Sequence, residues 1–262
     1  MALSDDEINK IALMLVQSKE QRTPLLTGEL SGFSLEQFKE AYDIQNAVAN
    51  IRQETFGRSA RVWKASAADV NAEPVAAPIP SQWVYQSPTT VVSTNFNMIG
   101  VEAELAFRFA EDLPKREKPY GRDEIMSAIE EVFVAIEIID SRIKDWKNAS
   151  QLWLLADNLV SGGFVQGSGV KLWEQLDPSN QQVLLLVDGV EKVVRQGGYP
   201  LGDPTLLVPW TVNHCIERHG IFSKGSMVTT GSWTGVVFVE PESEVQIMFP
   251  NIGEAKVRFS LI

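Results

Sequence analysis

The chain has 262 residues, which is enough to bury a sizeable hydrophobic core. Its 34 acidic and 23 basic residues give a formal net charge of -11, and this charge argues against nucleic acid or an anionic membrane as a partner. The single cysteine, Cys215, excludes an intrachain disulfide and a cysteine-rich zinc site.

The N-terminal sequence gives no sign of targeting to or through a membrane. The opening segment MALSDDEINK is acidic, whereas a signal peptide begins with positive charge. No apolar run approaches the roughly 20 residues that a transmembrane helix needs. Together with the lone cysteine, these features favour a cytoplasmic, reducing compartment.

Two helices are predicted in the N-terminal part of the chain. Ser4 and Glu7 form a capping box, and apolar residues follow it at helical spacing. Ser34 and Gln37 repeat this signature before a second, longer helix. We expect that helix to end near Gly57.

From Arg61 onward the sequence changes to short strand-like segments separated by proline and glycine. The proline-rich stretch 74–88 predicts an extended loop. A helix is predicted over residues 123–131, directly before a strand. Further strands are predicted at residues 182–187, 191–196, 227–230, 236–240, 244–249 and 255–261.

One more helix is predicted late in the chain. Asp203 and Pro204 resemble an N-cap and a first-turn proline, and the helix would run through His219 to end at Gly220. Pro209 lies inside this span, so it should kink the helix or delay its start.

These elements predict an α+β fold in which N-terminal helices precede a curled, mainly antiparallel β-sheet of roll or barrel-like form. We expect residues 1–60 to be an N-terminal helical segment and residues 61–262 to be a β-rich catalytic domain. The two parts are expected to form one continuous structural unit. The sequence contains no internal repeat, heptad run, P-loop or GxGxxG motif.

The most informative segment is VEAELAFRF, residues 101–109, which reads as a strictly alternating strand. It carries Glu102 and Glu104 on one face and apolar side chains on the other. Side chains two residues apart on a strand point the same way, with about 7 Å between Cα atoms, so both carboxylates can reach one hard cation. The competing interpretation is a solvated strand face without a ligand.

Glu137 supplies a third acid inside VFVAIEIID, a segment otherwise apolar up to its last residue. A carboxylate in such a run must be paired or neutralised, and a divalent metal shared with the other two glutamates would do this. Oxygen ligands favour Mg²⁺, Mn²⁺ or Ca²⁺, and only His214 and His219 are present to build a histidine site. A buried ion pair with Arg142 or Arg108 is the alternative.

Lys64 and two polar loops complete the candidate site. Lys64 lies among apolar residues in RVWKAS, where its pKa could be lowered for catalysis, although a surface lysine would look the same. Ser161 and Gly162 in LADNLVSGG, and Thr230 in TTGSWTG, could hold a substrate carboxylate. Plain turns explain both loops equally well.

The order of these motifs resembles the 2-oxopent-4-enoate (2-hydroxypentadienoate) hydratase family, within the wider fumarylacetoacetate hydrolase superfamily. The matching segments are AYDIQ, RVWKAS, VEAELAF, AIEIIDSRIKDW, LADNLVSGG, the GDP helix start and TTGSWTG. The resemblance implies the curled-sheet fold of the C-terminal domain of fumarylacetoacetate hydrolase.

By this resemblance, Glu102, Glu104 and Glu137 hold Mg²⁺ or Mn²⁺, and Lys64 moves protons during the reaction. The implied substrate is a small anionic 2-oxo acid or its 2-hydroxydienoate enol. Glutamate rather than aspartate at position 137 implies the hydratase and decarboxylase branch of the superfamily. The polar loops with Ser161, Gly162 and Thr230 then become the expected substrate-binding segments.

We therefore expect a metal-dependent hydro-lyase, a 2-keto-4-pentenoate-type hydratase of aromatic-compound catabolism. The chain departs from the family pattern in PIPSQWVYQSP, which has no aspartate where the resemblance implies one. A 4-oxalocrotonate-type decarboxylase, an acylpyruvate-type C–C hydrolase and a non-catalytic homologue acting as a complex subunit therefore remain alternatives. The resemblance also implies a homo-oligomer and contact with a partner enzyme of the same pathway.

Overall fold

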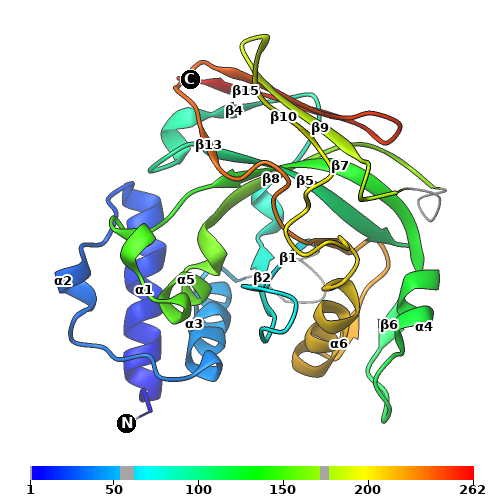
Figure 1. Ribbon diagram of the computed structural model, residues 1–262. Helices are drawn as coiled ribbons and strands as arrows, with labels where there is room; N and C mark the ends of the chain where they lie inside the picture. The colour runs from blue at the N-terminus through cyan, green and yellow to red at the C-terminus, as the bar shows by residue number, and fades with distance from the viewer. Residues whose placement is uncertain (1, 54–61, 172–176) are drawn as a thin grey trace.

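The computed structural model describes residues 2–53, 62–171 and 177–262. A curled eight-stranded sheet lies at its centre, a five-stranded sheet covers one side of it, and most helices gather on the other side (Figure 1). The predicted α+β fold, with N-terminal helices and a curled, mainly antiparallel sheet, is confirmed.

Two longer helices open the chain, α1 (Asp5–Gln21) and α3 (Phe38–Ile51), with the short α2 (Thr27–Leu30) between them. The predicted capping box at the start of α1 is confirmed. The backbone N–H of Ser4 donates to Glu7 Oε2 at 2.9 Å, and the backbone N–H of Glu7 donates to Ser4 Oγ at 3.4 Å. Two backbone donors that the helix leaves unpaired are thereby satisfied.

The second long helix begins later than predicted. Gln37, and not Ser34, is its N-cap, because Glu40 at the third helical position accepts a hydrogen bond from the Gln37 amide at 3.0 Å. The helix ends at Ile51, earlier than expected. Gly57, near which its end was predicted, lies outside the described residues.

The central sheet runs in the order β2-β1-β12-β5-β7-β8-β3, and β13 also pairs with β5. Its strands are β1 (Val62–Ser66), β2 (Val75–Ile79), β3 (Val84–Gln86), β5 (Gly100–Phe109), β7 (Ile129–Ile139), β8 (Ser161–Val170), β12 (Met227–Thr229) and β13 (Val237–Phe238). β1 with β12 and β3 with β8 are parallel, and the other pairs are antiparallel. The edge strands β2 and β3 are separated in the chain only by residues 80–83, so the sheet bends round into a half-barrel.

The proline-rich stretch 74–88, predicted as an extended loop, contains the strands β2 and β3 instead. Pro78 is tolerated in β2 because this strand is an edge of the sheet, where a missing N–H need not break a ladder hydrogen bond. Pro74 and Pro80 lie just outside the ends of β2. Proline therefore marks the boundaries of an edge strand here rather than a loop.

The second sheet runs in the order β10-β9-β14-β15-β4 and alternates buried and partly exposed residues in β9 and β14. Its strands are β4 (Thr89–Val92), β9 (Gln182–Val187), β10 (Val190–Gln196), β14 (Glu244–Phe249) and β15 (Gly253–Ser260). The predicted strands 182–187 and 244–249 are confirmed, and the other predicted late strands are present with slightly different ends. Apolar side chains of this sheet and of one face of β5 and β7 form the largest hydrophobic core.

The remaining helices are α4 (Arg122–Ser127), α5 (Gln151–Ala156) and α6 (Val208–His219), and the short strands β6 (Leu113–Pro114) and β11 (Ile221–Phe222) pair with each other. α4 is shorter than the predicted helix 123–131, because β7 already begins at Ile129. None of the helices in the described ranges has both the length and the apolar character needed to span a bilayer.

α6 starts at Val208, later than the predicted start at Asp203 and Pro204. Pro209 lies in its first turn, where a missing N–H needs no helical partner, so this proline delays the helix instead of kinking it. The predicted end at Gly220 is confirmed, and this glycine has a φ of 83°, a left-handed conformation that caps the helix.

The face of the curled sheet that is turned away from the five-stranded sheet has its own apolar cluster. Its buried members are Val62, Ile79, Ala106, Phe133, Ala135, Phe164 and Met227. Because side chains alternate along a strand, Ala106 shares a face with Glu104, and Ala135 shares one with Glu137. The predicted acidic residues therefore enter an apolar interior.

Aromatic contacts join α6 to α3 and to β1. The His214 ring lies 4.5 Å from the Trp210 ring and 4.7 Å from the Tyr42 ring, measured between centroids. The His219 ring stacks on the Trp63 ring at 5.2 Å. Burial of the two imidazoles lowers the pKa of each to about 4. Both histidines are thus packed against aromatic rings.

These two histidines should make the fold sensitive to acid. Their folded-state pKa values of about 4 lie below the ordinary value of 6.5, so the unfolded chain binds more protons between these pH values. Stability should therefore be lost as the pH falls from about 6.5 to about 4. We expect the variant His214→Phe, which keeps an aromatic ring, to show a smaller fall in Tm over this window in thermal unfolding followed by circular dichroism. An unchanged pH dependence would contradict this assignment.

Candidate metal centre

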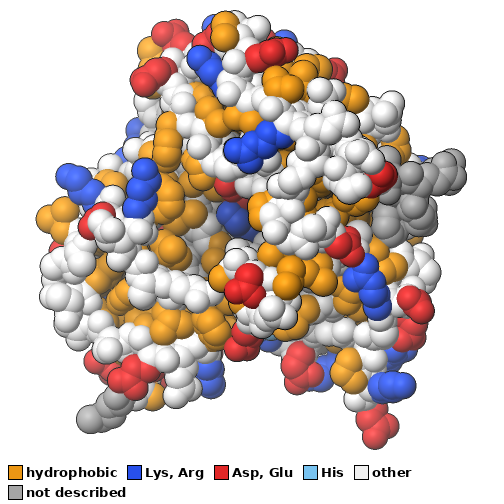
Figure 2. All heavy atoms as spheres, in the orientation of Figure 1, with side chains coloured by type: hydrophobic (Ala, Val, Ile, Leu, Met, Phe, Trp, Pro, Cys, Tyr) orange, Lys and Arg blue, Asp and Glu red, His pale blue; other side chains and the backbone are white. Residues whose placement is uncertain are grey.

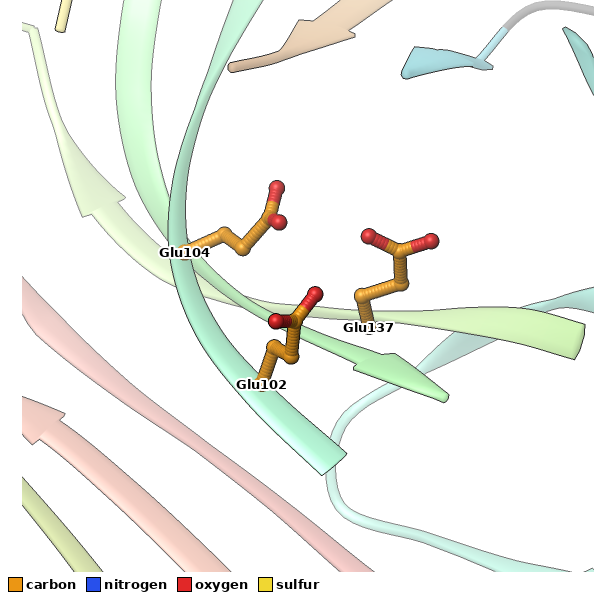
Figure 3. Close-up of side chains that lie close together, drawn as sticks. All are labelled: Glu102, Glu104 and Glu137. Atoms are coloured by element: carbon orange, nitrogen blue, oxygen red, sulfur yellow. The ribbon is translucent and has the colours of Figure 1, made fainter. Parts of the chain in front are cut away.

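Three glutamates from two neighbouring strands meet on the inner face of the curled sheet. The register of β5 and β7 pairs Glu102 directly with Glu137, and Glu104 lies two residues further along β5 on the same face. One carboxylate oxygen from each of the three lies within 4.8 Å of the others. Figure 3 shows the three side chains reaching into the same space, two from one strand and one from its neighbour.

The three carboxylates are buried. The exposed fraction is 9% for Glu102 and 0% for Glu104 and Glu137, so they do not form a solvated strand face. Burial raises the pKa of Glu102, and it raises the pKa of Glu137 well above the ordinary value, because the charged form loses its hydration. Glu104 Oε1 and Glu137 Oε2 have no hydrogen-bond partner among the described residues. Buried oxygens of this kind require a proton or a ligand.

The two arginines considered as partners for Glu137 are engaged elsewhere. Arg142 forms a buried ion pair with Asp157. Arg108 Nη2 lies 3.6 Å from a carboxylate oxygen of Glu131. The positions of these side chains therefore do not support a buried ion pair between Glu137 and either arginine.

Lys64, on β1, is the basic side chain that faces the cluster. Its Nζ lies 2.9 Å from Glu137 Oε1 and 3.9 Å from Glu102 Oε2, and it donates a hydrogen bond to the Leu159 carbonyl oxygen at 3.2 Å. Burial alone would lower the pKa of Lys64, but attraction to the three carboxylates outweighs it and raises the pKa. This direction is opposite to the one expected from the apolar neighbours, because the acids come from distant parts of the sequence.

The donor set fits a hard divalent cation. With all three carboxylates ionised to bind a metal, the ammonium of Lys64 would leave a net charge of minus two, which one dication would balance. All three candidate ligands are carboxylates, whose oxygens suit Mg²⁺ and Ca²⁺. These residues could therefore hold a divalent metal ion.

Residues 229–234 run beside β5 and contact Glu104. Thr229 Oγ1 donates a hydrogen bond to Glu104 Oε2, and the Gly231 amide donates to the same oxygen at 3.3 Å. Thr230, the residue predicted to bind substrate, donates its hydroxyl to the Pro204 carbonyl oxygen at 2.8 Å. The TTGSWTG motif drew attention to this segment, but the sequence could not show which of its hydroxyl groups faces the acid.

Ser161 and Gly162 lie at the start of β8. Ser161 Oγ is buried and has no hydrogen-bond partner among the described residues, so it could bind a polar group. A Cβ atom at position 162 would lie 2.5 Å from the Cβ of Asp140, so glycine is required there for close packing. Packing alone therefore explains the glycine at position 162, and its predicted role in substrate binding is not needed to account for it.

The short turn η4 (Asn158–Val160) precedes these residues and has an unusual backbone. The φ angles of Asn158, Leu159 and Val160 are 50°, 52° and 55°, so three successive non-glycine residues are left-handed. Such a conformation costs about 1–2 kcal/mol per residue. The turn carries the Leu159 carbonyl that accepts the hydrogen bond from Lys64.

The cluster keeps limited contact with the surface. Glu102 retains 9% of its exposed area and Lys64 retains 7%. In the space-filling view the surface is hollowed between the side that carries α1, α3 and α5 and the side that carries α6, and a basic side chain is visible inside the hollow (Figure 2). A small molecule could approach the sheet from this side.

Comparison with known proteins gives relatives at modest identity. The chain matches no family model. It is 28% identical over 160 residues to a 2-keto-4-pentenoate hydratase of Burkholderia vietnamiensis, a match that covers 61% of this chain and 60% of that protein. It is 26% identical over 136 residues to a 4-oxalocrotonate decarboxylase of Pseudomonas putida, covering 52% and 51%. The chain thus spans only about half to three fifths of the length of these relatives.

The fold comparison extends over almost the whole chain. The 4-oxalocrotonate decarboxylase from Pseudomonas putida G7, complexed with magnesium and adipate, has a TM-score of 0.84 at 21% identity and covers 98% of this chain and 99% of its own. The predicted resemblance to 2-oxopent-4-enoate hydratases is confirmed by the curated relatives, at 28% identity over part of the chain. A putative fumarylacetoacetate hydrolase family protein from Yersinia pestis shares the fold at a TM-score of 0.57 and 18% identity, covering 76% of this chain and 91% of that one.

A cation held by the three carboxylates should stabilise the folded protein. A ligand that binds only the folded state adds about 2.7 kcal/mol at a concentration of 100 times its Kd. We expect Mg²⁺ to raise Tm in scanning calorimetry, relative to EDTA, and Glu104→Gln and Glu137→Gln to lose this increase. The control Glu124→Gln alters an exposed acid that pairs with Arg116, and it should keep the increase. Equal Mg²⁺-induced shifts in Glu104→Gln and the wild type would contradict the assignment.

Proposed function

We propose that the protein is a divalent-metal-dependent lyase acting on a 2-oxo acid or its 2-hydroxydienoate enol, in the first place as a 2-keto-4-pentenoate-type hydratase. The observation that carries this proposal is the buried group of three glutamates facing Lys64 on a curled sheet. The names of the relatives add the substrate class, because they include hydratases and decarboxylases of unsaturated 2-oxo acids.

In this proposal Glu102, Glu104 and Glu137 are the metal ligands, and Mg²⁺ or Mn²⁺ is the metal. Their oxygen donors and buried negative charge support the choice of a hard dication. When bound there, the ion would act as a Lewis acid that stabilises negative charge on the 2-oxygen of the enolised substrate. Thr229 and Gly231 would hold Glu104 in its orientation through the hydrogen bonds to Oε2.

Lys64 is the proposed proton carrier. Its ammonium lies beside the carboxylates and is hydrogen-bonded to the Leu159 carbonyl, so it can hold a proton close to a substrate that the glutamates help to bind. The reaction of a hydratase requires protonation of the dienol carbon chain and addition of water at C4. The buried ring of Phe164, whose position on β8 pairs with Glu137, would exclude bulk water from the reacting atoms. The buried ring of Phe133, on the same face of β7 but four residues before Glu137, would extend this apolar lining.

Decarboxylation of a 4-oxalocrotonate-type substrate is the second candidate, and one observation favours it. The stretch 78–88 contains no acid, and Asp69 is exposed and bonded to the amides of Asn71 and Ala72. Loss of CO₂ needs enolate stabilisation and one returning proton, both of which the glutamates and Lys64 could support. Hydration needs an additional group to direct the water.

The organisation of the chain is part of the proposal. We propose that residues 61–262 form the catalytic unit and that residues 1–60 pack on it as one continuous structure. Apolar residues of α1 and α3 share a core with Val75 and Ala77 of β2, which supports this arrangement. Assembly into a homo-oligomer and contact with a partner pathway enzyme are further expectations from the resemblance. A cytoplasmic location is an expectation from the single cysteine and the acidic N-terminal segment.

The proposed activity can be tested directly with two substrates. We expect full-length protein with Mg²⁺ to consume 2-hydroxypenta-2,4-dienoate, followed by ultraviolet absorbance, and to lose this activity in EDTA and in Glu104→Gln. 4-Oxalocrotonate is assayed in parallel for release of CO₂, and faster turnover of this compound would make decarboxylation the main activity. Turnover that survives both EDTA and Glu104→Gln would remove the metal-dependent mechanism.

The role of Lys64 predicts a separation between turnover and metal binding. We expect Lys64→Ala to lower kcat by about 10²–10⁴-fold, the usual contribution of general acid–base catalysis. Metal affinity, measured by calorimetric titration with Mg²⁺, should change far less, because Lys64 is not a proposed ligand. Lys171→Ala removes an exposed lysine paired with Glu130 and serves as the control. Parallel loss of turnover and metal affinity would contradict the assigned role.

A further inference from the structure

We propose that Arg142 and Asp157 are positioning residues for Lys64. Their buried ion pair holds residues 158–160 in the left-handed turn that aims the Leu159 carbonyl at Lys64 Nζ. The inference rests on the proposed function in one respect, namely that Lys64 carries the proton.

Arg142 contacts the chain on both sides of the turn. Its Nε donates to Asp157 Oδ1 and its Nη2 donates to the Asp157 carbonyl, directly before the turn. Its Nη1 donates to the Ser161 carbonyl at 2.7 Å, directly after the turn, and to the Asp140 carbonyl at 2.9 Å. One guanidinium therefore fixes the distance between the two ends of the turn and ties both ends to the end of β7.

Asp157 is held in place as firmly as its partner. Its side chain is fully buried, and its Oδ2 accepts hydrogen bonds from Ser141 Oγ at 2.8 Å and from the Arg142 amide at 3.1 Å. The Asp157 carbonyl also accepts the Val160 amide at 3.0 Å inside the turn. Because the planar guanidinium and the carboxylate are both hydrogen-bonded to backbone groups, the ion pair also fixes the backbone of the turn.

The backbone of the turn needs such support. Three successive left-handed residues without glycine are strained, and Val160 is β-branched, which makes this conformation especially unfavourable for it. Strained backbone of this kind persists only where surrounding contacts determine it, and it is concentrated at functional sites. Here the consequence is visible, because the middle residue of the turn presents its carbonyl oxygen to Lys64 Nζ at 3.2 Å.

If the ion pair between Arg142 and Asp157 served stability alone, its loss would not be expected to change the position of Lys64 specifically. Buried ion pairs are weak evidence for stability by themselves, since burial costs much of what the charges gain. The carbonyl of Leu159 supplies a contact to Lys64 from outside the carboxylate cluster. Loss of this contact should let the ammonium move toward the glutamates, while Glu104 keeps its hydrogen bonds from Thr229 and Gly231.

The test uses the full-length Arg142→Lys variant, which keeps the charge and loses the planar fork. We expect its crystal structure to show the Leu159 carbonyl beyond hydrogen-bond distance of Lys64 Nζ. We expect kcat on the preferred substrate to fall about 10- to 100-fold, as displacement of a reacting group by about 1 Å can produce. KM and the Mg²⁺ affinity from calorimetric titration should stay within about twofold of the wild type.

Arg116→Lys is the matched control, because it makes the same exchange away from the turn. Arg116 Nη2 pairs with Glu124 Oε2 at 2.7 Å. This variant should keep kcat within about twofold. Should Arg142→Lys fail to fold, Ser141→Ala removes one hydrogen bond to Asp157 without leaving an unpaired charge. It should lower kcat in the same direction with KM and metal affinity retained.

The outcomes separate this inference from the proposed function. An unmoved Leu159 carbonyl in Arg142→Lys would overturn the inference, and so would a displaced carbonyl with wild-type turnover. Parallel losses of turnover and Mg²⁺ affinity would also overturn it, because they would indicate general damage to the site. If the wild type turns over neither substrate, the proposed function fails, and the crystal structure of the variant alone decides whether the pair positions Lys64.

Discussion

The arrangement depends on one register, the antiparallel pairing that sets Glu102 of β5 opposite Glu137 of β7. Since side chains alternate along each strand, this pairing carries Glu104 to the same face and brings three carboxylates into an apolar interior. A shift of either strand by one residue would turn its own acids to the opposite face, against the largest hydrophobic core, and would separate the three carboxylates. The charge of the site and the packing of the sheet are therefore determined together.

The rest of the fold supplies what this buried charge requires. In the strand order, β12 and β5 separate β1 from β7. Because the sheet curls, the Lys64 side chain of β1 nevertheless lies 2.9 Å from Glu137 of β7. The segment after β12 donates hydrogen bonds to Glu104, and the left-handed turn before β8 offers a carbonyl to Lys64. Each support comes from a different part of the chain, which explains why separate short motifs spread over the sequence belong to one site.

Much of this could be predicted from the sequence, because alternation and capping are local signals. The strand carrying Glu102 and Glu104 and the apolar run around Glu137 follow from periodicity alone. The partners of these residues could not be predicted in the same way. The choice between lysine and arginine as the cation near Glu137 depends on strand order, which no local pattern records. Likewise, Pro78 lies in a strand because β2 is an edge, a property of the sheet and not of the segment.

The central claim is that the three glutamates share one divalent cation, and anomalous diffraction tests it most directly. Crystals grown with Mn²⁺ and oxalate, a mimic of a chelating enolate, would locate the metal by its anomalous signal. The account predicts one strong peak within bonding distance of Glu102, Glu104 and Glu137, with oxalate completing the coordination. A structure with Mn²⁺ absent from this position, and with the carboxylates neutralised by Lys64 and by protons alone, would contradict it.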